Sequence, residues 1–326
     1  MAEDTTGSHA SSGVVGAHAA SEGAPTIEVA DLVKQYGKTT ALAGLTLTVR
    51  RGEVLGFLGP NGAGKTTAVK LLLGLSRPTS GGGAVLGAPL GDRAARARIG
   101  YLPELFRYQA WLSAREVLRL HCDLAGIPST RHAAEIDGAL DHVGLVSRAD
   151  DRVGTFSKGM QQRLGLGVAL LGSPDLVFLD EPTSALDPVG RHDVREIIRD
   201  LKRRGATVFL NSHLLSEVEQ VCDRVAVVDH GRVIASGALD ELLRGGQTVR
   251  IHMTGLTAAA ESQLRAQFGD FDTEGGWYAF QAIAAESVPE LVAAAVHLGG
   301  RVYRVETRLE SLEDRFLQLL GERGGE

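Results

Sequence analysis

Short apolar segments alternate with helix-like segments along most of the chain. Compact apolar runs bounded by turn residues predict strands buried on both faces, as in parallel sheets. Such strands are expected at 54–58, 99–102, 176–179, 207–210 and 225–228. The intervening stretches predict helices at 66–73, 113–125, 132–143, 159–171, 189–203 and 214–221. This alternation predicts a parallel α/β core.

Other segments have a different pattern. Residues 27–32 and 45–49 alternate apolar and polar positions, which is typical of half-buried strands. The Gly-rich and Pro-rich stretch 77–91 predicts turns and short strands, and the glycine-bounded segment 231–237 predicts a further strand. Ser113 and Glu116 have the spacing of a capping box, which predicts a helix start.

The order of elements changes beyond a Gly-rich boundary at 243–246. We expect a strand at 248–253, a helix at 258–268, short strands around Phe271 and Tyr278, a helix at 288–298 and a strand at 302–305. This order resembles a ferredoxin-like βαββαβ unit. A last amphipathic helix starting at Ser311 is predicted to place four apolar residues on one stripe: Leu312, Phe316, Leu319 and Leu320.

These patterns predict three parts. Residues 1–24, rich in Ala, Gly, Ser and His, are expected to form a disordered tail without the features of a signal peptide. Residues 25–244 are predicted to form the α/β domain, with a helical subdomain at about 105–172. Residues 245–326 are predicted to form a small accessory α+β domain.

Composition narrows the functional classes. The 326 residues are 44% hydrophobic and carry a net charge of −6, so no nucleic-acid partner is expected. No apolar run approaches the ~18 residues that cross a bilayer, so a membrane role would need a separate partner. Cys122 and Cys222, far apart and in no motif, are predicted to be buried free thiols.

A phosphate-binding loop is the clearest chemical motif. Residues 59–66 fit the pattern G-x-x-x-x-G-K-[ST] between an expected strand and an expected helix. Backbone N–H groups of such a loop surround phosphate oxygens at a helix N-terminus. Lys65 would reach the outer phosphates and the Thr66 hydroxyl would bind Mg²⁺. The expected nucleotide contacts are Gly59, Pro60, Asn61, Gly62, Ala63, Gly64, Lys65, Thr66 and Thr67. The alternative is an ordinary Gly-rich turn.

Two acidic residues follow the apolar strand at 176–179. Its carboxyl end would deliver Asp180 and Glu181 to the edge where parallel sheets bind ligands. Asp180 is expected to hold Mg²⁺ near Thr66, and Glu181 to polarise the attacking water. His213 follows the strand at 207–210 and is expected to contact the γ-phosphate or Glu181. A capped turn and a structural histidine are the alternatives.

With these motifs, residues 26–243 resemble the ATP-binding subunit of an ABC transporter. Phe156 to Met160, followed by two glutamines, is similar to the family's signature, and Ser184 to Asp187 is similar to its interface loop. Tyr36 matches the aromatic residue that stacks on adenine, and His213 matches the switch histidine. Glu104 stands where the family usually has a glutamine that senses Mg²⁺ and the membrane subunit.

The resemblance implies an ATPase that uses ATP and Mg²⁺ as a head-to-tail dimer, a homodimer or a heterodimer with a similar ATPase. In that arrangement the signature residues Ser157, Lys158, Gly159 and Met160 contact the ATP bound by the partner, and Asp187 lies at the dimer interface. Lys158 and Met160 depart from the usual Gly and Gln. Lys158 adds positive charge near a phosphate, whereas Met160 loses a hydrogen-bonding group. Glu104 is a candidate metal ligand together with Thr66 and Asp180.

The variant residues and the C-terminal segment 310–316 resemble the drug- and sodium-export ATPases, including the daunorubicin-resistance type. This implies an exporter subunit at the cytoplasmic face of the membrane, peripherally bound to a membrane-spanning permease. The helical subdomain is the expected contact surface, with Phe106, Tyr108 and Trp111 as aromatic candidates or as local packing residues. The alternatives are a soluble ABC ATPase of the translation or DNA-repair type, and a module that binds ATP without hydrolysing it.

Overall fold

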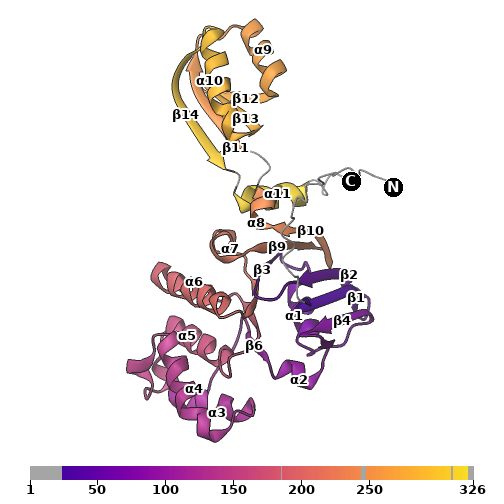
Figure 1. Cartoon of the computed structure of the whole chain (residues 1–326), viewed down its shortest axis with the longest axis vertical. Coiled ribbons are helices and arrows are strands. Elements are labelled where there is room, and N and C mark those ends of the chain that lie inside the picture. The colour runs from indigo at the N-terminus through magenta and orange to yellow at the C-terminus, as the bar shows by residue number, and fades with distance from the viewer. Residues whose placement is uncertain (1–23, 185, 244–246, 310, 322–326) are drawn as a thin grey trace, which may run out of the picture.

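The computed structural model describes residues 24–184, 186–243, 247–309 and 311–321. Within them the strands form three sheets (Figure 1). The predicted N-terminal tail lies outside the described residues except for Ala24. The sheets and the helices packed on them form an α/β body and a smaller α+β unit.

A six-stranded sheet forms the centre, in the order β10-β9-β3-β8-β7-β6. Strands β9, β3, β8, β7 and β6 run parallel, and β10 pairs antiparallel at the edge. Five of the six were expected from apolar runs, and β10 was expected from the glycine-bounded segment at 231–237. Their bounds are β3 Val54–Leu58, β6 Ile99–Leu102, β7 Leu176–Asp180, β8 Thr207–Asn211, β9 Arg224–Asp229 and β10 Arg232–Ala238.

The central strands are apolar throughout because both sheet faces are covered. Within β3, Leu55 and Phe57 join one hydrophobic cluster, whereas Val54 and Leu58 join a second cluster on the other face. Phe209 of β8 lies between two neighbouring rings. Its ring centroid is 5.0 Å from that of Phe57 and 4.9 Å from that of Phe178. Aromatic packing of this kind adds to the area that these side chains bury.

An antiparallel sheet and helix α1 (Lys65–Leu72) cover one face. The strand order is β2-β1-β4-β5. These strands are β1 Ile27–Tyr36, β2 Thr39–Val49, β4 Ser80–Val85 and β5 Ala88–Pro89, and the short helix α2 spans Arg93–Arg96. Strands β1 and β2 run longer than their alternating patterns predicted, because pairing to each other and to β4 satisfies the extra backbone groups.

A helical segment follows β6. It contains α3 Ala114–Leu124, α4 Ser129–His142, the 3₁₀ turns η1 Val146–Arg148 and η2 Val153–Thr155, and α5 Lys158–Ala169. The predicted capping box is present, with Ser113 and Glu116 exchanging hydrogen bonds. Of the three aromatic residues before α3, Phe106 and Tyr108 pack against the hydrophobic core, whereas Trp111 is 70% exposed. Local packing therefore accounts for the first two.

Three helices complete the α/β body: α6 Pro188–Arg203, α7 Leu215–Val221 and α8 Leu239–Leu243. Helix α8 was missed by sequence analysis, since its five residues are too few to show a helical period. Cys122 and Cys222 are both buried and free, as expected. Among the described residues, no helix is both long and apolar enough to cross a bilayer.

The third sheet has the order β12-β13-β11-β14, with every neighbouring pair antiparallel. Together with its two helices it has the βαββαβ order of a ferredoxin-like unit, as the sequence suggested. The elements are β11 Gln247–Thr254, α9 Ala258–Phe268, β12 Phe271–Glu274, β13 Trp277–Ile283, the turn η3 Ala285–Ser287, α10 Val288–His297 and β14 Arg301–Leu309.

The last helix, α11 (Leu312–Gly321), packs away from this unit. It contacts α7 and α8 of the α/β body and lies between the two parts in Figure 1. Leu312 is buried in the larger hydrophobic cluster, and Phe316 packs against it. Two members of the predicted apolar stripe therefore bind the α/β body, while the side chain of Leu319 lies outside the described residues.

The central aromatic stack yields a stability prediction. Phe209→Ala should lower the free energy of unfolding by about 3–5 kcal/mol, because it leaves a cavity between two rings. Leu75→Ala is the control, since Leu75 is 59% exposed; we expect a change within about 0.5 kcal/mol. Urea unfolding followed by circular dichroism measures both, and equal midpoints for the two variants would contradict the prediction.

Candidate active site

The loop between β3 and α1 is shaped by glycines. A Cβ on Gly59 would meet the carbonyl oxygen of Val228 at 2.2 Å, so the backbone here can approach β9 only without a side chain. Gly64 has a φ of 100°, and a Cβ there would meet the carbonyl oxygen of Ala41 at 2.4 Å. No side chain caps α1, which leaves its first backbone N–H groups available to an anion.

The other predicted loop residues differ in their exposure to solvent. Asn61, Gly62 and Thr66 are exposed, Thr67 is half-buried, and Ala63 is buried. Ala63 N–H donates to the carbonyl of Pro60 at 3.2 Å, which closes the turn. The exposed residues of the loop are thus Asn61 and Gly62, followed by Thr66 at the start of α1.

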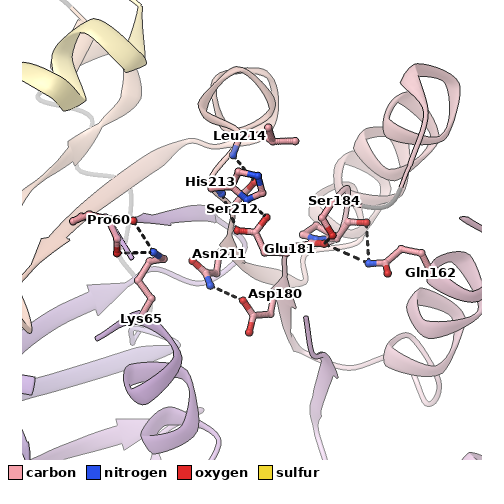
Figure 2. A network of polar contacts seen from close by, with 12 residues as sticks. Pro60, Lys65, Gln162, Asp180, Glu181, Ser184, Asn211, Ser212, His213 and Leu214 are labelled. Carbon is pink, nitrogen blue, oxygen red and sulfur yellow. Dashed lines mark hydrogen bonds and ion pairs between the residues drawn. The ribbon is translucent and has the colours of Figure 1, made fainter. Parts of the chain in front are cut away.

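Lys65 lies across this loop. Its Nζ donates to the carbonyl oxygens of Gly59 at 2.6 Å and Pro60 at 3.1 Å (Figure 2). Burial lowers the pKa of Lys65, and the charges of Glu181, Asp180 and Glu104 act in the opposite direction. The ammonium is therefore within electrostatic reach of all three carboxylates.

Asp180 ends β7 and is buried. Its carboxylate accepts a hydrogen bond from the side-chain amide of Asn211, at the end of the neighbouring strand β8. Burial raises the pKa of Asp180, and Glu104 adds to this while Asn211 and Lys65 oppose it. A backbone hydrogen bond from Glu104 also reaches Asp180. Glu104, itself exposed, thus lies beside the acid that the sequence placed at this edge.

Glu181 has an unusual backbone for a residue with a side chain. Its φ is 53°, in the left-handed region, and its N–H donates to the carbonyl of Asn211 at 2.9 Å. Strained residues of this kind persist where the surroundings hold them, and they cluster at functional sites. This turn aims the carboxylate at the end of β8 rather than along its own strand.

His213 holds that carboxylate from two sides. Its backbone N–H donates to Glu181 Oε1 at 2.9 Å, and its Nδ1 lies 2.7 Å from Oε2 (Figure 2). Because a carboxylate accepts, Nδ1 carries a proton in this contact, and Nε2 is the ring nitrogen left for a second contact. The Glu181 side chain is 10% exposed and that of His213 is 62% exposed. His213 makes the Glu181 contact that was one of its two expected contacts.

Gln162 was missed as a site residue. This buried side chain of α5 donates from Nε2 to the carbonyl oxygens of Glu181 at 3.4 Å and Pro182 at 3.1 Å. Ser184 Oγ donates to the same Glu181 carbonyl at 3.1 Å. The signal available in the sequence was a glutamine on the second turn of the helix that the signature opens. Through these hydrogen bonds Gln162 connects α5 to the turn at Glu181.

The signature residues lie elsewhere on the surface. Ser157 is the N-cap of α5 and accepts from the N–H of Met160 at 3.2 Å. Ser157 and Lys158 are exposed, Gly159 is half-buried, and the Met160 side chain packs against the core. They belong to the helical segment, whereas the phosphate loop leads into α1 beside the antiparallel sheet (Figure 1). One chain does not bring the two motifs together.

Two further predicted residues are placed at the periphery. Tyr36, at the end of β1, is 49% exposed, and the ammonium of Lys34 lies 4.9 Å from its ring centroid. Asp187 is the N-cap of α6 and accepts from the N–H of Gly190 at 2.8 Å. Its neighbour Ala185 lies outside the described residues.

The oxygen atoms near the loop suit a hard cation that completes its coordination with phosphate oxygens and water. Thr66, Asp180 and Glu104 offer oxygen atoms, and the buried Asn211 Oδ1 next to Asp180 has no hydrogen-bond partner among the described residues. Within the same part of the chain, no group of three His, Cys, Asp or Glu side chains could hold a metal alone. Mg²⁺ fits this arrangement, because it is usually held by one or two carboxylates plus phosphate oxygens and water.

Comparison with known proteins gives the family. The profile of the ABC transporter family matches residues 42–184. An uncharacterized ABC transporter ATP-binding protein of Nostoc sp. is 42% identical, over 86% of this chain and 83% of its own length. The Nod factor export ATP-binding protein I of Rhizobium sp. is 37% identical, over 90% of this chain and 97% of its own. The bacitracin transport ATP-binding protein of Bacillus licheniformis is 35% identical over the same shares.

Solved structures agree on the fold. An ATP-binding subunit of an ABC transporter matches 67% of this chain and 92% of its own with a TM-score of 0.62 and 33% identity. A dimeric ATP-binding cassette in a post-hydrolysis state, bound to ADP and phosphate, matches 65% of this chain and 98% of its own with a TM-score of 0.60 and 23% identity. The chain therefore belongs to the ATP-binding subunits of ABC transporters, a family of ATPases.

Proposed function

We propose that this chain energises export through a separate membrane-spanning subunit by hydrolysing ATP in a dimer. The observation that carries the proposal is the Glu181 carboxylate, held by His213 at the sheet edge that also receives the phosphate loop. The relatives named for Nod factor export and bacitracin transport support export. The relatives reported above are named as transporter proteins, which favours transport over a translation or repair role.

The nucleotide would be bound by the loop and its helix. The N–H groups from Gly59 to Thr67 would surround the phosphates, Lys65 would turn from its carbonyl partners to the outer phosphates, and Tyr36 would stack on adenine. Thr66, Asp180 and Glu104 would hold Mg²⁺, directly or through water. When bound, Mg²⁺ supplies charge that stabilises the phosphates during transfer.

Glu181 would act as the general base. Its carboxylate is pinned by two hydrogen bonds from His213, so its orientation is set before any water arrives. It would orient the attacking water and accept its proton, and Nε2 of His213, carrying a proton of its own, would donate to an oxygen of the γ-phosphate. Lys65 would stabilise charge on the transferred group. An intact base of this kind argues against a module that only binds ATP.

A second subunit would complete each site. The exposed Ser157 hydroxyl and the N–H of Gly159, at the start of α5, would meet the γ-phosphate held by the partner, with Lys158 adding positive charge. The Met160 side chain packs inward, so only its backbone would take part. Asp187 would lie at the interface. The partner would be a second copy of this chain or a similar ATPase.

The permease would dock on the helical segment at 105–172. Leu105 and Trp111 are 87% and 70% exposed there, and an exposed aromatic residue suits a groove contact. We place the protein peripherally at the cytoplasmic face of the membrane, because export requires contact with that subunit. We further propose residues 25–244 as the ATP-binding domain and 245–326 as an accessory domain.

The first functional prediction concerns binding. Lys65→Ala should weaken ATP binding by at least about tenfold, because a charged hydrogen-bonding partner of the phosphates is lost. Lys70→Ala is the matched control, since Lys70 is an exposed lysine on the same helix. Filter binding with labelled ATP measures both. Unchanged affinity in the Lys65 variant would refute the loop assignment.

Loss of the general base should separate binding from hydrolysis. Glu181→Gln should slow phosphate release by about a hundredfold or more while ATP affinity is kept. Size-exclusion chromatography with ATP and Mg²⁺ should then show a trapped dimer. Glu196→Gln, at an exposed position of α6, is the control. A turnover rate in Glu181→Gln equal to that of the control would remove Glu181 from the base role.

A third prediction concerns the metal. Glu104→Gln should shift the Mg²⁺ dependence of hydrolysis by about tenfold, because one negative charge near Asp180 is removed. ATP affinity measured without Mg²⁺ should stay the same. The readout is the half-saturating Mg²⁺ concentration at saturating ATP, and identical titrations for the two proteins would count against metal contact by Glu104.

A further inference from the structure

Helix α7 starts directly after the histidine of the site. His213 is followed by Leu214, whose N–H donates to Ser212 Oγ at 3.1 Å, and α7 begins at Leu215. The helix spans only seven residues. A short helix has little stability of its own, so its position is set by what packs on it. The contacts of α7 therefore fix the direction from which His213 reaches Glu181.

One side of α7 is anchored to the α/β body. Glu217 forms an ion pair with Arg195 of α6 through two hydrogen bonds of 2.8 and 3.0 Å, and both side chains are largely buried. Val218 fills the space beside Gly56, where a Cβ would approach its Cγ1 to 2.7 Å. Gly56 belongs to β3, the strand that leads into the phosphate loop. These contacts hold α7 against α6 and β3 of the α/β body.

The other anchor comes from the C-terminus. Leu312, the first residue of α11, is 2% exposed and shares a hydrophobic cluster with Val218 and Val221. Its backbone N–H donates to the Glu219 carboxylate of α7. This places a negative charge at the N-terminus of α11, where the helix dipole favours it. Phe316, one turn later, packs against the same cluster.

The start of α11 is itself well fixed. Ser311 N–H and Oγ donate to Asp314 Oδ2 at 3.1 and 2.7 Å, and Asp314 N–H donates back to Ser311 Oγ at 3.1 Å. Strand β14 of the accessory sheet ends at Leu309, only shortly before this cap. Along the chain, a single residue separates the accessory sheet from Ser311, and α11 in turn contacts α7.

We propose that Leu312 and Glu219 are positioning residues for hydrolysis: through α7 they hold His213 against Glu181, so the packing of α11 on α7 sets the rate of the ATPase site. This inference rests on the proposed role of His213. It extends that role, because it assigns to the last helix a part in catalysis without contact to nucleotide. A loosened α7 shifts His213 and frees the Glu181 carboxylate to rotate.

The kinetic signature follows from the geometry. The phosphate loop lies between β3 and α1, whereas the main helix contacts of α11 are with α7 and α8. Leu312→Ala should therefore lower kcat by about tenfold to a hundredfold, as small displacements of catalytic groups do, with KM for ATP changed by less than about threefold. A merely structural role would lower folded protein and nucleotide affinity together.

The chain offers a matched control on the same helix. Leu317 of α11 is 61% exposed, so Leu317→Ala makes the same chemical change at a largely exposed position of the same helix. The full-length Leu317 variant should keep the parent kcat and KM. Leu312→Met, which keeps most of the apolar volume, should restore most of the activity. Glu219→Ala removes only the carboxylate that accepts from the Leu312 N–H. It should also lower kcat selectively, but by a smaller factor than Leu312→Ala.

A double-mutant cycle with His213→Ala is the decisive test. If Leu312 acts through His213, adding Leu312→Ala to His213→Ala should change the single-turnover rate by less than about twofold, because coupled residues are not additive. Additive losses, a loss of ATP affinity that parallels kcat, or equal effects at Leu317 would overturn the inference. If Leu312→Ala does not fold, the same cycle with Glu219→Ala decides.

The controls also separate this inference from the function it rests on. Full activity in His213→Ala would remove the proposed role of His213 in hydrolysis. A strong loss in His213→Ala with full activity in both Leu312→Ala and Glu219→Ala would leave the catalytic site intact and overturn only the positioning role.

Discussion

Parallel pairing of β3, β8 and β7 is the constraint on which the site depends. Val54 is in register with Val208, and Leu176 with Thr207, so the three strands end at one edge. That edge receives a phosphate loop from β3, an acid pair from β7 and Asn211 from β8. No one of these segments makes a site alone. The register holds because each strand buries alternate residues on both faces, and a slip by one residue would exchange the two clusters.

The charges gathered at this edge balance one another only in part. Lys65 lies within reach of three carboxylates, and burial disfavours the charged forms of both Lys65 and Asp180. Asn211 gives Asp180 one donor but keeps its own buried carbonyl oxygen unpartnered among the described residues. Buried polar groups left in this state cost stability. The excess of carboxylates around Lys65 and the unpartnered Asn211 oxygen fit a site whose ligands bring a cation and hydrogen-bond donors.

Sequence patterns predicted the core strands to within about a residue because those strands have continuous apolar centres, with polar residues only at their ends. The place of the Gly-rich loop between β3 and α1 was equally predictable, since its spacing is fixed by backbone geometry. Gln162 and helix α8 were not. Gln162 matters only because α5 lies against the Glu181 turn, a contact between residues far apart in sequence. The left-handed backbone of Glu181 also depends on that tertiary setting, and no local pattern encodes it.

The C-terminal helix shows how a late segment can act on an early motif. The amphipathic stripe was predicted from the sequence, but an apolar stripe does not identify the surface on which it packs. The surface that it covers includes α7, which makes polar contacts with two other helices. Glu217 pairs with Arg195 of α6, and Glu219 accepts from the N-terminus of α11. An apolar contact alone would let α7 slide, whereas directional bonds at both sides fix its rotation. Since His213 precedes α7 by two residues, fixing that rotation also fixes the imidazole that orients the Glu181 carboxylate.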